Sequence, residues 1–252
     1  MRITVLGSGS AFSDLARFNS AYLVEAGDSR FMIDCGSDAL RAMQKAGIDM
    51  FSIQHIFVTH MHADHCGGIP AVLTAMHVLG RTEPMNIYMP STQLEFAKSW
   101  LDNFFIYNER WSFKFRLLPL DVGKVSLTRN VELEAIATDH LERYKESALK
   151  SGINPLSFSV IVREGNKSFF FSGDLGSIQE VDSYVGCSLA FVEAAHPPLE
   201  EISRISREAG DKAFFTHIPQ ELENDGTWRK ELEARFGVET LNAVHDGQVF
   251  TI

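Results

Sequence analysis

Short apolar runs recur along the chain and are separated by turn-forming residues. Residues 2–6 form the first run. The runs at 21–24 and 31–34 are joined through Gly27-Asp28, which is typical of a β-hairpin. Apolar runs of this length, bounded by Gly, Pro or Asp, favour strands over helices. Further strands are expected at 87–89, 125–127, 131–138, 157–162, 169–171, 188–192 and 213–215.

Longer segments with helical character lie between these strands. One of them precedes Gly47, a residue type that commonly ends helices, and another starts with Thr92 and Glu95 at the spacing of a capping box. The interleaving predicts a layered α/β fold, and without a repeat or linker we expect one domain over residues 1–252. The expected helices are 39–46, 69–79, 92–101, 199–208 and 228–236.

The segment from Trp100 to Phe115 is rich in aromatic residues. The alternation of Trp111, Phe113 and Phe115 predicts a strand with one apolar face. We favour an ordinary core role for these side chains. The alternative is a rim that covers a cleft or docks a second subunit.

Four side chains that commonly bind metal ions fall within six positions at the end of an apolar run. They read His60-x-His62-x-Asp64-His65, and a glycine pair follows. In an extended chain alternate side chains point to the same side, so His60 and His62 can face one ion. Asp64 and His65 fall where the chain turns into the next helix and can face a second ion. Imidazole and carboxylate ligands together suit a divalent ion such as Zn²⁺.

Further Asp, Glu and His residues follow later strands of the predicted fold. Functional groups on such loops gather at one edge of a sheet, so we expect these side chains to meet the histidine segment. For Asp34 two interpretations stay open: a helix cap, or an acceptor that orients a ligand imidazole. Asp139 and Glu193 are candidates for the same orienting role. The candidate ligands from these later loops are His140, Asp174 and His217.

With these residues assembled, the chain resembles the metallo-β-lactamase superfamily, within it the ribonuclease Z and cyclic phosphodiesterase branch. The resemblance covers nearly the whole chain and rests on Leu6-Gly7-Ser8-Gly9, Ile33-Asp34-Cys35-Gly36, the histidine segment, Ser172-Gly173-Asp174 and Thr216-His217. It implies an αββα sandwich with a dinuclear metal site at one edge of two sheets. By position it implies one ion on His60, His62 and His140, another on Asp64, His65 and His217, and Asp174 bridging both.

The resemblance also implies a hydrolytic mechanism. A water shared by two ions would lose a proton near neutral pH and attack, oriented by Asp64. His196 is the candidate proton donor, because His196-Pro197-Pro198 resembles the cyclic phosphodiesterase of bacterial phosphonate breakdown. The alternative is that His196 is only a polar residue at a strand end. We expect two Zn²⁺ ions, with Mn²⁺ as the alternative metal, and a homodimer.

The composition of the chain indicates which substrates and which cellular compartment to expect. The net charge is −10 over 252 residues and no basic run occurs, which favours a small phosphodiester over a long nucleic acid. Cys35, Cys66 and Cys187 show no paired spacing, as expected of a reducing compartment, so we expect a cytoplasmic protein. No apolar run approaches the roughly 20 residues of a membrane span, and the first one is too short for a signal peptide.

The third histidine helps to choose among branches of the superfamily. In glyoxalase II, the lactonases and the β-lactamases, the region of the third histidine resembles P-G-H-[ST]. This chain has Thr138-Asp139-His140-Leu141 instead, which disfavours thioester, lactone and lactam substrates. Ribonuclease Z has a tRNA-gripping arm between the third His and the bridging Asp, and residues 141–173 leave little room for one. Its H-E-A-T segment is matched only in part, at Glu193-Ala194.

The favoured function is therefore a metal-dependent phosphodiesterase acting on a small or cyclic phosphodiester. A tRNA 3′ endonuclease is the main alternative, followed by a lactone or thioester hydrolase of the same fold. A metal-stabilised binding protein without chemistry is the alternative from another class. In the favoured case the loop 141–155 lies beside the site, and its Arg143, Tyr144 and Lys145 can contact a phosphate or a base.

Overall fold

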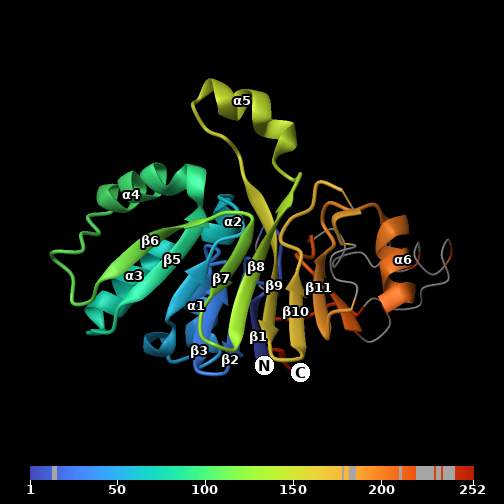
Figure 1. Cartoon of the computed structure of the whole chain (residues 1–252), viewed down its shortest axis with the longest axis horizontal. Helices are drawn as coiled ribbons and strands as arrows, with labels where there is room; N and C mark the ends of the chain where they lie inside the picture. Colours follow the sequence, from blue (N-terminus) through green and yellow to red (C-terminus); the bar gives the residue numbers. More distant parts are fainter. Residues whose placement is uncertain are drawn as a thin grey trace.

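Two β-sheets pack face to face in the middle of the molecule, and helices cover their outer faces (Figure 1). This computed structural model describes residues 1–12, 16–177, 179–181, 186–209, 212–219, 230, 234 and 242–252. Helices α1 (Ala39–Lys45) and α3 (Ile69–Val78) lie on one side of the sheets and α6 (Leu199–Ala209) on the other (Figure 1). The expected αββα sandwich is confirmed.

The first sheet has the strand order β13-β1-β2-β3-β4-β5-β6 in the described part of the chain. Strands β3, β4, β5 and β6 run parallel to one another, while β1 pairs antiparallel with β2 and β13. The ends of β3 and β4 therefore share one edge, which brings the loops after them together. The bounds are β1 (Arg2–Gly7), β2 (Ala21–Ala26), β3 (Ser29–Ile33), β4 (His55–Phe57), β5 (Met85–Pro90), β6 (Phe115–Leu120) and β13 (Val249–Thr251).

The second sheet has the order β12-β11-β10-β9-β8-β7 among the described residues. β9 pairs antiparallel with β8 and β10, and β10, β11 and β12 are parallel. β8, β10, β11 and β12 therefore all end at the same edge. The bounds are β7 (Gly123–Ser126), β8 (Val131–Thr138), β9 (Ser157–Glu164), β10 (Lys167–Phe171), β11 (Leu189–Glu193) and β12 (Ala213–Thr216).

The helices are short, and their bounds follow the sequence signals closely in most cases. α1 stops just before Gly47, as expected. In the described residues, no helix combines the length and the apolar character needed to span a bilayer. The bounds are α1 (Ala39–Lys45), α2 (Ala63–Cys66), α3 (Ile69–Val78), α4 (Leu94–Asn103), α5 (Lys145–Lys150), α6 (Leu199–Ala209), and the 3₁₀ turns η1 (Met50–Ser52), η2 (Ser91–Gln93) and η3 (Glu142–Tyr144).

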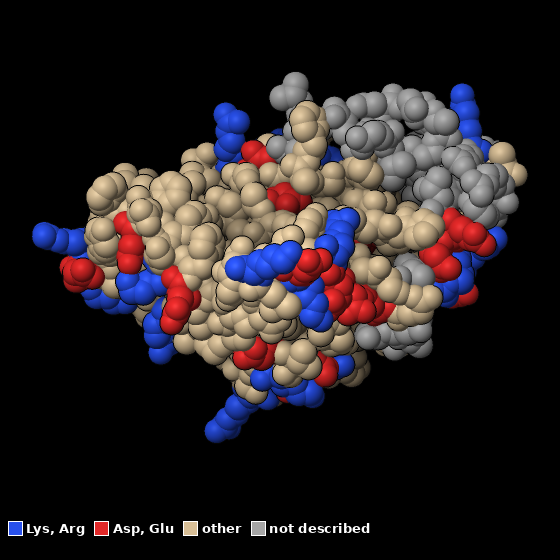
Figure 2. Space-filling view, turned by 90° about the horizontal axis from the view of Figure 1, so that it is seen from above, with Lys and Arg blue, Asp and Glu red and all other residues tan. Residues whose placement is uncertain are grey.

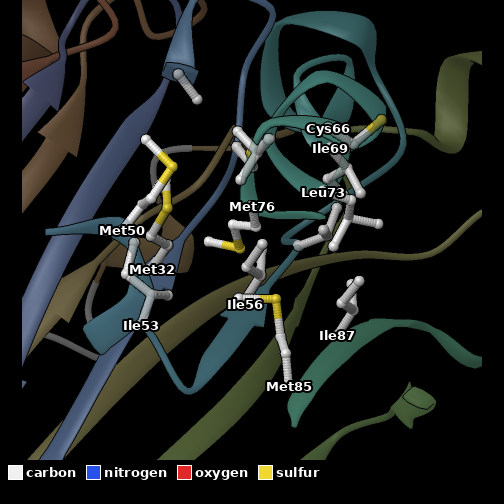
Figure 3. Close-up of a cluster of buried hydrophobic side chains, with 14 of the residues drawn as sticks. Met32, Met50, Ile53, Ile56, Cys66, Ile69, Leu73, Met76, Met85 and Ile87 are labelled. Atoms are coloured by element: carbon white, nitrogen blue, oxygen red, sulfur yellow. The ribbon is translucent and has the colours of Figure 1, made fainter. Parts of the chain in front are cut away.

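The core has three layers. Between the sheets, aromatic rings fill the space; Phe57 stacks on Tyr88 with ring centres 4.4 Å apart. Beneath α1 and α3 lies a second cluster that uses several methionines, including Met32 and Met76 (Figure 3). Methionine adapts to irregular space, which suits the join between short helices and a twisted sheet. A third cluster packs α6 onto the other sheet.

Two predictions for residues 92–115 are wrong. Trp111 and Phe113 precede β6, which begins at Phe115, and Trp111 stacks on His77 of α3 with ring centres 4.7 Å apart. Aromatic alternation can therefore come from a loop that packs on a helix. Thr92 caps no helix: its hydroxyl donates to Asn154 O at 2.6 Å.

The remaining differences concern elements with weak local signals. β13, α5 and η3 are present although the apolar pattern did not predict them. The helix expected at 228–236 lies mostly outside the described residues. Within the aromatic segment, Phe113 and Phe115 are buried as expected of core, whereas Phe104 and Phe105 are exposed.

Candidate metal centre

The histidine segment follows β4 and runs along the shared edge of the first sheet. His60 and His62 lie in extended chain and point to the same side, with His60 Nε2 3.0 Å from His62 Nδ1. Asp64 and His65 belong to the single turn of α2, which begins immediately after His62. The predicted arrangement of this segment is therefore the observed one.

Close backbone packing fixes α2 against the loop after β3. His65 O accepts from Cys35 N at 2.7 Å, and Cys35 O accepts from Gly68 N at 2.9 Å. A Cβ atom at Gly68 would lie 2.2 Å from Gly36 O, so only glycine permits this approach. Gly68 thus permits the backbone hydrogen bonds that hold α2, and His65 with it, against the loop after β3.

One group of candidate ligands combines both sheets. His60 and His62 come from the first sheet, His140 follows β8, and Asp174 follows β10. His140 Nε2 lies 3.3 Å from His62 Nδ1 and 3.5 Å from Asp174 Oδ2. One ligand atom from each of the four residues lies within 4.8 Å of the others.

A second group lies beside the first. His217 Nε2 is 3.2 Å from Asp64 Oδ2 and 3.4 Å from His65 Nε2. Asp174 lies between the groups, with Oδ2 3.7 Å from His60 Nε2 and Oδ1 3.3 Å from His65 Nε2. All seven candidate ligands therefore lie together, in the two groups that the family resemblance implied.

Several atoms in this cluster lack a protein partner that would satisfy them. Nitrogen faces nitrogen between His60 and His62, and again between His65 and His217, at 3.0 and 3.4 Å, so each pair is satisfied only if one nitrogen carries a proton or a cation lies between the two. Within the described chain, the buried atoms Asp174 Oδ1 and His217 Nδ1 make no well-aligned hydrogen bond, although Oδ1 lies 3.3 Å from His65 Nε2 and 3.6 Å from His217 Nδ1. Converging lone pairs and orphaned buried polar atoms are costly unless a cation or proton lies among them. The donor set fits divalent metal ions.

The pKa shifts of three histidines in the cluster agree with a site for metal ions. Burial lowers the pKa of His60 and lowers that of His140 to about 4, which favours the neutral form of both imidazoles. For His217 burial is outweighed by the carboxylates of Asp174 and Asp64, which raise its pKa to about 10. A cation bound there would displace that proton.

Asp34 contacts His65, a member of the second group. Its Oδ2 lies 2.6 Å from His65 Nδ1, and it accepts further bonds from Thr59 N at 2.9 Å and the Ser20 hydroxyl at 3.0 Å. It does not cap α1, whose N-cap residue is Asp38. Of the two interpretations left open by the sequence, the contact with His65 favours the acceptor that orients an imidazole. Thr59 and Ser20 were not anticipated.

Glu193 and His196 lie on the other side of the cluster. Glu193 is fully buried and accepts from the backbone N–H groups of Leu175 and Ala195 at 2.9 and 2.8 Å. Its Oε1 lies 2.9 Å from His196 Nδ1, while the His196 side chain is 26% exposed. The His196 ring centre lies 4.6 Å from that of His140. His196 is therefore oriented by a carboxylate beside the candidate ligands.

Asp139 does not have the position expected of an orienting carboxylate. It is exposed, and in the part of the chain that the structure describes its carboxylate has no hydrogen bond to an imidazole. Its backbone N–H instead donates to Glu180 at 2.7 Å, and Glu180 also accepts from Gly176 N at 3.0 Å. Glu180 thus ties the loop after β8 to the loop after β10, a role without any local sequence signal.

Two site residues have a left-handed backbone, Asp34 with φ 58° and His217 with φ 52°. For non-glycine residues this conformation is strained and clusters at functional sites. The strain places both side chains toward the same cluster.

The cluster opens to solvent through a cleft of about 450 Å³. Its polar side comprises His62, Asp64, Asp174, His196 and His217. The rest of the wall comprises small residues and two larger ones, Arg143 and Tyr144. The volume falls in the range of small-molecule sites, roughly 300–1,000 Å³.

The fold and this site geometry agree with comparisons to known proteins. The family described as anti-Pycsar protein Apyc1 matches residues 1–237, almost the whole chain. The chain belongs to the Apyc1 family. The matched region includes every residue of the cluster, from Asp34 to His217.

Curated relatives of this Apyc1 family member include ribonuclease Z of Methanosarcina mazei, 32% identical over 140 residues. That match covers 56% of this chain and 45% of the relative, so the chain spans less than half the length of that relative. Among solved structures, human tRNase Z, short form, superposes with a TM-score of 0.74 at 18% identity, covering 100% of this chain and 99% of that chain. The metallo-β-lactamase fold protein YhfI from Bacillus subtilis gives 0.72 at 19%, covering 99% and 98%. The fold is the metallo-β-lactamase fold.

Proposed function

We propose that the protein is a dinuclear metal-dependent phosphodiesterase that hydrolyses small phosphodiesters, cyclic nucleotides in particular. The observation that carries this proposal is the convergence of seven imidazole and carboxylate side chains, in two adjacent groups with Asp174 between them. Two groups that share a carboxylate are the arrangement that two-ion hydrolysis needs.

The proposed ligands of one ion are His60, His62 and His140, and those of the other are Asp64, His65 and His217, with Asp174 shared. Neutral imidazole and carboxylate favour Zn²⁺, with Mn²⁺ as the alternative. When bound, the ions would activate water and stabilise negative charge on a phosphoryl oxygen. Asp34 would orient His65 through the Oδ2 contact at 2.6 Å. Asp64 would also orient the attacking water.

We assign the proton donor to His196. Glu193 Oε1 lies 2.9 Å from His196 Nδ1, and this contact leaves Nε2 for another partner. The His196 ring lines the same cleft as Asp64 and Asp174. A proton on Nε2 would therefore be available to a leaving alkoxide held at the cluster.

Charge and size favour a small substrate. On the face seen in Figure 2, the described basic and acidic residues are interspersed and form no continuous basic surface. The net charge is −10, whereas a protein that grips a long phosphate backbone usually presents a basic face. The family description, an anti-Pycsar protein, fits a cyclic nucleotide phosphodiesterase.

The second candidate is a tRNA 3′ endonuclease, which the ribonuclease Z relatives favour. Against it stands the short connection between β8 and β9, which holds only η3 and α5 and is too small for a long gripping arm.

The test is a substrate panel on protein of known metal content. We expect hydrolysis of 3′,5′-cyclic nucleotides and of bis-p-nitrophenyl phosphate, with little cleavage of a 3′-extended tRNA. Strong tRNA cleavage that weakens steeply with salt, without turnover of small diesters, would favour the endonuclease. No hydrolysis of any ester by the metal-loaded protein would favour a binding protein without chemistry.

We further propose a cytoplasmic homodimer built from one domain over residues 1–252. The exposed Phe96, Phe104 and Phe105 around α4, next to a cavity of about 760 Å³ between α4 and β6, support a subunit contact. The buried free cysteines support a reducing compartment. Light scattering on purified protein measures the oligomeric state directly.

A further inference from the structure

The connection between β8 and β9 leaves the second sheet and projects beyond it as η3 and α5 (Figure 1). No residue of η3 or α5 is buried, so these turns add little to the core. A hydrogen bond links this connection to the rest of the molecule: the Thr92 hydroxyl donates to Asn154 O, within the connection, at 2.6 Å. The position of this projection, directly after His140, suits a role at the cleft better than a role in stability.

Tyr144 is the side chain of this projection that reaches back to the site. Its ring meets that of His62 edge-on, with centres 5.7 Å apart and planes at 88°. The residue nevertheless stays 46% exposed, so much of its surface remains open. The Arg143 guanidinium lies 4.9 Å from the centre of the same ring. Tyr144 is thus held between a candidate ligand and a cation.

The other walls of the cleft leave room for a flat group. Ser10, Ala11, Ala63 and Ala195 are small, and apart from histidines Tyr144 is the one aromatic residue among the described lining residues. The cleft therefore has a charged end at the candidate metal ligands and an aromatic side at Tyr144. A nucleotide has the same two parts, an anionic phosphodiester and a flat base.

We propose that Tyr144, packed against Arg143, is the platform on which the nucleobase of the substrate stacks while its phosphodiester lies at the metal centre. This inference rests on the proposed function and adds the residue that selects nucleotides over other diesters. Stacking on an aromatic side chain tolerates every base, because each base has a π-face. We therefore expect the platform to favour nucleotides as a class.

Binding without turnover tests the platform. Calorimetry with Zn²⁺-loaded protein compares uridine and adenosine 5′-monophosphates with ribose 5-phosphate, which lacks a base. We expect the nucleotides to bind about tenfold more tightly, since the 1.4 kcal/mol this requires lies within the range for base stacking. Tyr144→Ala should remove the preference and Tyr144→Phe should keep it. Tyr107→Ala, which changes a tyrosine at the other cavity, is the matched control and should keep it.

The possible results distinguish the Tyr144 platform from the proposed phosphodiesterase activity. Equal binding of nucleotides and ribose 5-phosphate by the unaltered protein, or a full preference in Tyr144→Ala, would overturn the platform. A Tyr144-dependent preference in a protein that hydrolyses no diester would support the platform and refute the phosphodiesterase. In an active protein, Tyr144→Ala should lower kcat/KM about tenfold more for thymidine 5′-monophosphate p-nitrophenyl ester than for methyl p-nitrophenyl phosphate. An equal loss on both esters would mark Tyr144 as structural only.

Discussion

Asp34 Oδ2 lies 2.6 Å from Nδ1 of His65, below the group formed by His65, Asp64 and His217. The carboxylate is fully buried and its other lone pairs are occupied by Thr59 and Ser20. A ligand imidazole whose second nitrogen donates to a fixed carboxylate is held in one tautomer and one orientation. We therefore propose that Asp34 is a positioning residue for His65.

Replacing Asp34 by Asn tests this role. Asparagine keeps the shape and tolerates the left-handed backbone, but it removes the charge that fixes the His65 tautomer. We expect metal affinity to fall about 10–100-fold, the usual effect of losing such a partner. Competition with a metal chelator measures this. Asp102→Asn, near the C-terminal end of α4 where the carboxylate pairs with Lys98, should leave affinity unchanged; unchanged affinity in Asp34→Asn would refute the positioning role.

His196→Ala tests the assigned proton donor. A positioned general acid contributes roughly 10²–10⁴-fold, so we expect turnover of a cyclic nucleotide to fall by about 100-fold or more. p-Nitrophenolate leaves without a proton, so esters with that leaving group should lose much less. Bound metal, measured by elemental analysis, should stay the same. Equal losses for both leaving groups, or full turnover of the cyclic nucleotide, would show that His196 is no proton donor.

Arg81 provides a test of stability away from the site. Its side chain is buried and donates to five backbone carbonyls, those of Met50, Phe51, Ile53, Glu83 and Pro84. Lysine has three donors on a flexible stem and cannot replace the guanidinium fork. Because buried carbonyls lose their partners, Arg81→Lys should lower the free energy of unfolding by about 2–4 kcal/mol in urea titrations.

Arg116→Lys is the matched control for that substitution. Arg116 is exposed and donates from Nε to Asn86 Oδ1 at 2.9 Å. Surface changes of this kind are usually within about 0.5 kcal/mol. If Arg81→Lys were as mild as Arg116→Lys, the carbonyl cluster around Arg81 would not be a stabilising feature.

The buried thiols predict a pH dependence. Burial raises the pKa of Cys66 to about 12 and also raises that of Cys35. Thiols of the unfolded chain ionise near pH 8.5, so the stability linked to these groups is complete below about pH 8.5 and is lost as pH rises toward 12. At pH 9 a thiol reagent should react with both cysteines slowly in the folded protein and rapidly in urea. Rapid reaction of the folded protein at pH 9 would contradict this.

The sequence predicted the candidate site best where the ligands lie close together in the chain. The order His60-x-His62-x-Asp64-His65 has its spacing written in the chain, so the same-side placement of His60 and His62 followed from strand periodicity alone. His140, Asp174 and His217 were reachable because each follows an apolar strand, and the resemblance supplied their grouping.

Contacts between segments far apart in the chain could not be predicted from the sequence. Thr59 and Ser20 meet Asp34 through tertiary packing, and Glu180 bonds the loop after β8 from 41 positions away. Asp139 shows the converse: a carboxylate next to a ligand in sequence can point elsewhere. The strand expected at Trp111 failed because apolar alternation does not separate a strand from a loop packed on a helix.

The most direct test of the account is the number of divalent ions that one chain binds. After loading with Zn²⁺ and removal of free metal, elemental analysis should find two ions per chain, and Asp174→Ala should bind fewer because both groups lose the carboxylate they share. A folded protein that binds no ion, or an Asp174→Ala variant that keeps both with undiminished affinity, would contradict a shared two-ion centre.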